Sequence, residues 1–158
     1  MKKFELTSET KINIFGKKLF RIKALISFGN VEAGETGGWV EKEENVNQSG
    51  NAWVSGNAEV FDNARVSGNA EVSGNARVFG NADYATIHGF GTQFRTTTFF
   101  RCKDKQVKVS CGCFYGTIPE FREQVKNTRK GKIAEEYLMI ADLMEKHFAE
   151  EAKIEEAS

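Results

Sequence analysis

A six-residue repeat in the middle of the chain constrains its fold more than any other feature. Residues 49–84 divide into six hexads with Asn-Ala at the same two positions, reading SGNAWV, SGNAEV, FDNARV, SGNAEV, SGNARV and FGNADY. Each hexad places Ala two residues before Val or Tyr, and residues two apart lie on the same face of a strand. The repeat therefore predicts short strands that bury Ala and Val, separated by sharp Gly-Asn or Asp-Asn corners.

The variable positions indicate that three hexads make one turn. Residues eighteen apart would then lie above one another at the inter-strand spacing of about 4.8 Å. This arrangement creates two pairs of opposite charge and one aromatic stack: Glu59 with Arg77, Arg65 with Asp83, and Phe61 with Phe79. We therefore expect about three turns over residues 38–84.

The hexad at 54–59, VSGNAE, resembles the hexapeptide repeat of the left-handed parallel β-helix superfamily. This resemblance implies a mainly β fold with a left-handed parallel β-helix of about three coils. Many members of that superfamily are acyltransferases, usually trimers with active sites between subunits. The wider layout, including TTTFFRCKDKQVKVSCGCFYGTIPEF, also resembles small phage and prophage proteins with GNA repeats, which implies a phage or prophage origin.

The remaining segments predict four parts. Residues 1–37 alternate in polarity around a Gly16-Lys17 turn, which is typical of a hairpin that caps the repeats of 38–84. Residues 85–117 contain a second hairpin with its turn at 103–106. Residues 118–158 predict two C-terminal helices, at 118–129 and 132–154. Thr117 and Glu120 form a capping-box pattern that marks the start of the first helix.

Composition fits a small protein of neutral overall charge. The chain has 158 residues with equal numbers of acidic and basic side chains, which argues against a general polyanion binder. No apolar run approaches the roughly 18 residues of a membrane span, and the first residues lack the apolar core of a signal peptide. We therefore expect no membrane association and a cytoplasmic location in a bacterial host.

Histidine is the usual general base of hexapeptide acyltransferases, so His88 is the weak catalytic candidate. It lies just beyond the last hexad, and no nearby carboxylate motif suggests an orienting partner for it. The hexads also run without the inserted loops that the superfamily uses for substrates. The alternative reading makes His88 an ordinary loop or contact residue, and we expect no cofactor.

Three cysteines raise the question of a disulfide or a metal site. With a turn at 103–106, Cys111 would face Thr98, about four residues or 13 Å along the strand from Cys102, beyond disulfide reach. Cys111 and Cys113 are weak candidates for a zinc site, because Cys-x-Cys falls short of a four-ligand pattern. Reduced thiols are the expected state.

A basic and aromatic segment follows the repeats. Residues 95–132 hold ten Lys or Arg against three acids, whereas residues 142–158 hold six acids against two lysines. Cations interleaved with rings can hold an anionic ligand by charge and stacking. The predicted ligand-binding residues are Arg95, Phe99, Arg101, Lys103, Lys105 and Lys108. The alternative is a solvated surface whose charges partly pair with the acidic end of the chain.

The expected function is binding rather than catalysis. The leading hypothesis is a phage or prophage counter-defence protein that inhibits a bacterial immune effector or sequesters its nucleotide signal. A hexapeptide acyltransferase and a structural or assembly protein are the alternatives. We expect a homotrimer, and the candidate interface residues are Phe61, Phe79, Tyr137, Met144 and Phe148, the last three on one stripe of the C-terminal helix.

Overall fold

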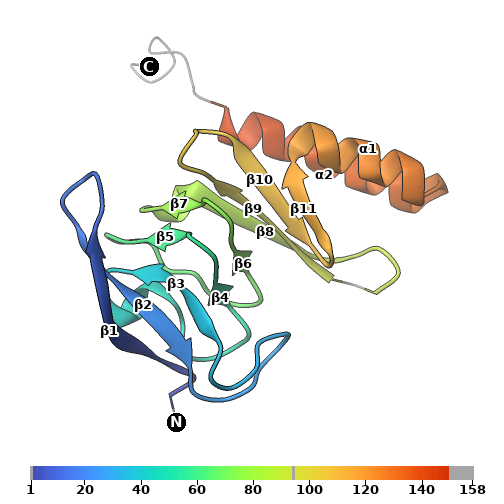
Figure 1. The fold of residues 1–158 in the computed structure, drawn as a ribbon. Helices are drawn as coiled ribbons and strands as arrows, with labels where there is room; N and C mark the ends of the chain where they lie inside the picture. Colours follow the sequence, from blue (N-terminus) through green and yellow to red (C-terminus); the bar gives the residue numbers. More distant parts are fainter. Residues whose placement is uncertain (1, 94, 150–158) are drawn as a thin grey trace.

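The computed structural model describes residues 2–93 and 95–149. Eleven strands and two α-helices are found in these residues (Figure 1). The strands are β1 (Phe4–Ile12), β2 (Lys18–Ala24), β3 (Thr36–Val40), β4 (Trp53–Val54), β5 (Glu59–Val60), β6 (Glu71–Val72), β7 (Arg77–Val78), β8 (Tyr84–Phe90), β9 (Arg95–Arg101), β10 (Val107–Cys111) and β11 (Phe114–Thr117). The helices are α1 (Ile118–Thr128) and α2 (Gly131–Phe148), and two short 3-10 turns cover Glu43–Asn45 and Asn81–Asp83.

The strands form three sheets. A five-stranded mixed sheet has the order β1-β2-β3-β5-β7, and a two-stranded sheet pairs β4 with β6. A four-stranded antiparallel sheet has the order β11-β10-β9-β8. Figure 1 shows this four-stranded sheet between the two helices and the strands of the repeat segment, residues 49–84.

The prediction of a mainly β protein built on a left-handed parallel β-helix is wrong. The protein is mixed α/β, and five of its eight strand pairings are antiparallel. The physical reason lies in strand length. The hexads bend at every corner and form strands of only two residues, whereas the flanking segments form strands of up to nine residues that pair as antiparallel neighbours.

The eighteen-residue spacing inside the repeat segment is confirmed. Glu59 pairs with Arg77, and Trp53 pairs with Glu71, both in parallel register. Asp83 is an exception, because it forms an ion pair with Arg101 at 3.3 Å instead of the predicted pair with an arginine of the repeat. The repeats thus stack as their variable positions predict, within a fold that the neighbouring antiparallel strands dominate.

The predicted burial of the Ala and Val positions is also confirmed for the first five hexads. All of their alanines and valines are buried: Ala52, Val54, Ala58, Val60, Ala64, Val66, Ala70, Val72, Ala76 and Val78. Left-handed backbone occurs before the corner asparagines, for example at Gly56 and at Asp62 with φ of 64° and 54°. The sixth hexad departs from this pattern, since Ala82 lies in a 3-10 turn and is exposed.

Two apolar cores share strand β9. Phe100 belongs to the core inside the repeat segment and the first hairpin, whereas Phe99 belongs to the core between the four-stranded sheet and the helices. Adjacent residues of a strand point to opposite faces, so one strand can serve both cores. An antiparallel bridge between Ala76 and Cys102 joins the end of β9 to the repeat segment.

The first hairpin is confirmed, and it does more than cover an end. β1 and β2 pair on either side of a turn at Gly16, and Phe15 in this turn contacts two rings of the repeat segment. Phe15 lies 6.0 Å from Phe61 and 6.1 Å from Phe79, measured between ring centroids. Leu19 and Trp39 bury Phe61 further, in a small third core.

The second hairpin has a register one residue away from the prediction. Thr98 pairs with Ser110, not with Cys111, because the turn closes with the Cys102 amide donating to the Gln106 carbonyl oxygen. A one-residue shift turns a side chain to the opposite face. Cys111 therefore lies on the helix side, where its Sγ accepts a hydrogen bond from the Thr97 hydroxyl at 3.1 Å.

The helices begin as predicted. The Thr117 hydroxyl accepts from the Glu120 amide, and the Glu120 carboxylate accepts from the Thr117 amide at 2.9 Å. Residues 129 and 130 separate α1 from α2, and α2 begins at Gly131, which has φ of 62°. Arg122 then joins the helices through ion pairs with Asp142 and Glu145, so part of the basic segment does pair with acids near the end of the chain. The predicted helical residues 150–154 lie outside the described residues.

Candidate functional site

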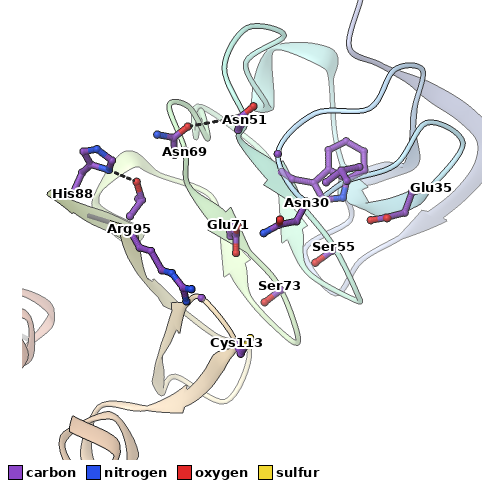
Figure 2. Close-up of a pocket in the computed structure, with 15 residues that line it drawn as sticks. Asn30, Glu35, Asn51, Ser55, Asn69, Glu71, Ser73, His88, Arg95 and Cys113 are labelled. Atoms are coloured by element: carbon purple, nitrogen blue, oxygen red, sulfur yellow. Dashed lines mark hydrogen bonds between the residues drawn. The ribbon is translucent and has the colours of Figure 1, made fainter. Parts of the chain in front are cut away.

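A polar groove of about 730 Å³ lies between the repeat segment and the four-stranded sheet (Figure 2). The outer face of the β4–β6 sheet forms its floor, and the loop at 29–35 forms one side. The opposite side comes from β8, β9 and the 112–113 turn. Figure 2 shows His88 and Arg95 on one side, Asn30 and Glu35 on the other, and Glu71 between them.

The floor of the groove follows from the parallel pairing of β4 with β6. Trp53 and Glu71 stand opposite each other, and Ser55 and Ser73 repeat the same offset two residues further on. Trp53 is only 5% exposed, and its indole Nε1 is buried with no hydrogen-bond partner among the residues that the structure describes. The floor therefore combines a buried aromatic ring with hydroxyl groups and one carboxylate.

Glu71 is fixed at the junction of the two halves of the protein. Its backbone amide donates to the Thr98 hydroxyl at 3.1 Å, and the Ser110 hydroxyl donates to its carboxylate at 3.4 Å. Thr98 and Ser110 pair with each other in the four-stranded sheet. The two strands of that sheet thus position a carboxylate that belongs to the repeat segment.

The corner asparagines contribute an amide pair at the end of the floor. The Asn51 side-chain amide donates to the Asn69 side-chain oxygen at 3.3 Å, across the eighteen-residue repeat. Gly50 and Gly68 precede them with φ of 74° and 65°, and a Cβ on Gly50 would lie 2.8 Å from the Gly68 carbonyl oxygen. Glycine at position 50 permits this close stacking.

Arg95 is the cationic group of the groove. Among the described residues, no carboxylate forms an ion pair with its guanidinium, which donates hydrogen bonds to the Gln93 side-chain oxygen instead. The guanidinium also lies against Gly112, because a Cβ on that glycine would come within 1.7 Å of Arg95 Nη1. Arg95 is therefore held over a glycine turn without a counter-charge, which leaves its charge available to an anion.

His88 lies near Arg95 and makes one side-chain hydrogen bond. Its Nδ1 lies 2.7 Å from the Thr96 hydroxyl, on the neighbouring strand β9. No carboxylate in the described ranges orients the ring, as a catalytic base usually requires. The geometry places His88 in a binding groove but does not give it the usual environment of a general base.

The other predicted ligand-binding residues do not gather at one place. Arg101 pairs with Asp83 and lies over the Phe148 ring, 5.2 Å from its centroid. Lys103 lies 3.1 Å from Glu59, so it too has an internal partner. Phe99 is fully buried in the core beneath the helices and is closed to a ligand.

Lys105 and Lys108 lie apart from the groove as well. Lys105 occupies the exposed hairpin turn with φ of 67°, and Lys108 lies over the Tyr115 ring at 5.8 Å. Of the six predicted residues, Arg95 alone lines the groove. The basic excess read from the sequence is therefore largely spread over internal ion pairs and separate surfaces.

The thiols have different environments. Burial raises the pKa of Cys102 to about 12, so its thiol stays protonated and inert. Cys111 is half-buried, and Cys113 is exposed at the edge of the groove. No group of three or more His, Cys, Asp or Glu side chains that could hold a metal ion is found in residues 2–93 and 95–149.

The candidate interface residues divide into two groups. Phe61 and Phe79 stack as predicted, with ring centroids 5.4 Å apart, but Phe61 is 2% exposed and Phe79 is 45% exposed. Tyr137, Met144 and Phe148 are buried within the chain, where they cover the four-stranded sheet. The helix stripe therefore packs on the protein itself, although the sequence made these residues candidates for an interface.

Sequence reasoning missed Glu71 and the serines of the floor. A signal was present, because each repeat position after Ala can be compared with its partner eighteen residues on. Glu59 meets Arg77, whereas Glu71 meets Trp53 and gains no compensating charge. At this repeat position, the sequence places each of the other two acids eighteen residues from an arginine. An acid without such a partner therefore indicates a face of the repeat segment with a different role.

No family model matches the chain, and a comparison with curated proteins also finds no match. None of the helices in the described part of the chain is long and apolar enough to cross a membrane.

Proposed function

We propose that the protein is a non-catalytic binding protein whose groove takes a small nucleotide-like anionic ligand. The observation that carries this proposal is the position of Arg95, a cation without a carboxylate partner in the described residues, on one side of a polar groove of about 730 Å³. Nucleotides combine an anionic phosphate with hydroxyl, amino and ring groups. The opposite side and the floor offer acceptors, hydroxyls and amides that suit those neutral groups.

The biological role that we propose is counter-defence by a phage or prophage protein in the cytoplasm of a bacterial host. Two routes fit this role: inhibition of an immune effector, or sequestration of its nucleotide signal. The groove favours sequestration, because a protein that only holds a nucleotide needs complementary polar groups and no general base. The GNA repeats support this role through their resemblance to the repeats of small phage and prophage proteins.

We also propose that the protein is a homotrimer. Its support is an exposed apolar patch formed by Ile14, Phe15 and Phe79, of which Phe15 is 55% exposed. The Arg77 guanidinium lies 5.1 Å from the Phe15 ring, so a cation borders the patch. Stacked, partly exposed rings of this kind usually mark a contact surface.

The acyltransferase alternative is kept for one reason: His88 lines the groove. Its partner is a threonine hydroxyl, which can hold the ring but cannot stabilise a developing imidazolium as a carboxylate does. The binding hypothesis needs no such stabilisation, and we therefore place it first.

Ligand binding tests the proposal directly. Mass spectrometry of the denatured protein after purification should reveal a bound phosphate-containing molecule, and isothermal titration with AMP should show saturable binding that weakens as salt rises. Arg95→Gln should weaken AMP binding by about ten- to a hundredfold, the value of a charge-assisted hydrogen bond.

Arg65→Gln is the matched control for this experiment. It removes the same charge from an exposed arginine of the repeat segment that does not line the groove. Equal losses in the two variants, or no loss in Arg95→Gln, would remove the groove from the proposal.

A further inference from the structure

The carboxylate of Glu71 differs from the other carboxylates at its repeat position. The position after Ala is occupied in turn by Trp53, Glu59, Arg65, Glu71, Arg77 and Asp83. Glu59 has Lys11 and Lys103 within 3.1 Å, and Asp83 has Arg101 at 3.3 Å. Glu71 has no Lys or Arg within 4.0 Å in the described residues, although it belongs to the same column.

The hydrogen-bonding capacity of Glu71 is also largely unused. An ionised carboxylate offers about four acceptor positions. The hydroxyl of Ser110 occupies one of them at 3.4 Å, a long hydrogen bond. Glu35, the other carboxylate of the groove, already accepts from the backbone amide of Glu32 in its own loop. Because the bond to Glu35 is also 3.4 Å long, the two carboxylates have similar free capacity, and Glu71 differs from Glu35 in standing on the floor of the groove.

Position and backbone restraint make Glu71 a selective group. It stands on the floor between the Arg95 side and the Asn30 side of the groove (Figure 2). Its backbone amide donates to the Thr98 hydroxyl, which fixes the point on the floor from which the side chain extends. Because an ionised carboxylate only accepts hydrogen bonds, a ligand carbonyl oxygen or unprotonated ring nitrogen placed beside it is repelled.

We propose that Glu71 selects ligands that present a neutral hydrogen-bond donor to the floor of the groove while their phosphate lies at Arg95. This inference rests on the proposed function. In a nucleotide, the donor has two possible sources, an exocyclic amino group of the base or a hydroxyl of the ribose. Both groups can donate a hydrogen bond to the Glu71 carboxylate. Because they lie at different positions in the nucleotide, experiments can distinguish them.

Three probes compare these sources: AMP, IMP and 2′,3′-dideoxy-AMP. IMP carries a carbonyl where AMP carries its amino group, and the dideoxy nucleotide lacks both ribose hydroxyls. Wild-type protein should bind AMP at least about tenfold more tightly than one of the two analogues, the factor expected from one hydrogen bond to a charged acceptor. The analogue that loses affinity identifies the group beside Glu71.

Glu71→Ala should abolish this preference by removing the acceptor, and Glu71→Gln should abolish a preference for AMP over IMP, because its amide can also donate to the carbonyl of IMP. Glu135→Gln, which removes a carboxylate from the exposed face of α2, should keep the preference of the wild type. Circular dichroism and thermal unfolding of each variant identify any loss that comes from misfolding.

Two results would overturn the inference and can be told apart. If the wild type binds all three nucleotides equally, or if Glu71→Ala retains the preference, Glu71 is not the selective group although the groove still binds nucleotides. If the wild type binds none of the three, the inference and the proposed nucleotide function both fail.

Discussion

The Lys103 ammonium, in the turn between β9 and β10, lies 3.1 Å from the carboxylate of Glu59 in the repeat segment. Glu59 is 3% exposed, and Lys11 of the first hairpin lies 2.9 Å from the same carboxylate. One buried acid thus joins three parts of the chain that are distant in sequence. Asn13 adds a hydrogen bond at 3.3 Å from its side-chain amide.

Glu59→Gln should therefore destabilise the protein by about 3 kcal/mol, because removing one partner leaves the other charges partly buried without compensation. Urea unfolding monitored by circular dichroism would measure the change. Glu44→Gln, an exposed acid on the surface, should change stability by less than about 0.5 kcal/mol. Equal stability of Glu59→Gln and wild type would mean that the cluster contributes no net free energy.

The same cluster predicts acid sensitivity. Burial alone would raise the pKa of Glu59, but the hydrogen bonds from Lys11 and Lys103 outweigh burial and lower it below its ordinary value of 4.5. A lowered pKa in the folded state contributes stability that is present above pH 4.5 and is lost as pH falls through the folded-state pKa. Between pH 6 and pH 3, wild type should lose more unfolding free energy than Glu59→Gln. Parallel losses would contradict this assignment.

The apolar patch predicts the outcome of an assembly experiment. Phe15→Ser with Phe79→Ser should lower the mass measured by light scattering from trimer toward monomer, because both rings are exposed in the single chain. Phe61 is unsuitable for this test, since its burial means that Phe61→Ser would damage the fold. Met139→Ser with Leu143→Ser, on the exposed face of α2, is the control. An unchanged mass in the phenylalanine variant would show that the patch is not the trimer interface.

His88 provides a test between binding and catalysis. We expect no acetyl transfer from acetyl-CoA to amine or hydroxyl acceptors, because the ring has a threonine hydroxyl as its partner and not a carboxylate. A thiol-release assay with free CoA as the standard would measure transfer. Transfer that is present in wild type and absent in His88→Ala would make acyltransferase the better description.

Gly112 tests the position of Arg95 without changing any charged group. Gly112→Ala should weaken AMP binding, because the new Cβ occupies the place of the guanidinium. Gly16→Ala is the matched control: its φ of 80° carries a similar backbone cost, but no atom lies within 4 Å of the added carbon. Both variants should lose about 1 kcal/mol of stability, and only Gly112→Ala should lose affinity. Unchanged affinity there would show that Arg95 can move without consequence.

The sequence predicted local features of this fold better than its architecture. The burial of Val66, the stack of Phe61 on Phe79 and the helix cap at Thr117 all depend on short, regular spacings, and each is confirmed. The fold class was wrong because a repeat reveals how its own units stack but not how much of the sheet structure comes from its neighbours. The register of the second hairpin was wrong because one hydrogen bond at its turn decides it.

The candidate site was the hardest part to predict. Its groove combines Glu71 from the repeat segment, Arg95 from β9 and Asn30 from an early loop, and no spacing in the chain relates them. Charge counting selected Arg101 and Lys103, whose charges have partners inside the fold. A sequence shows how many cations a segment carries, but their partners depend on tertiary contacts.

The two adjacent phenylalanines of β9 limit how such a protein can change over time. Phe99 completes the core under the helices, and Phe100 completes the core of the repeat segment. A recombination event could exchange either the repeat segment or the helical part for a homologous sequence. Strand β9 would then fit the core on one of its faces and not the core on the other. The halves are therefore expected to be inherited together, and hybrid genes joined between residues 84 and 95 should yield folded protein only when both parents supply matching residues at these two positions.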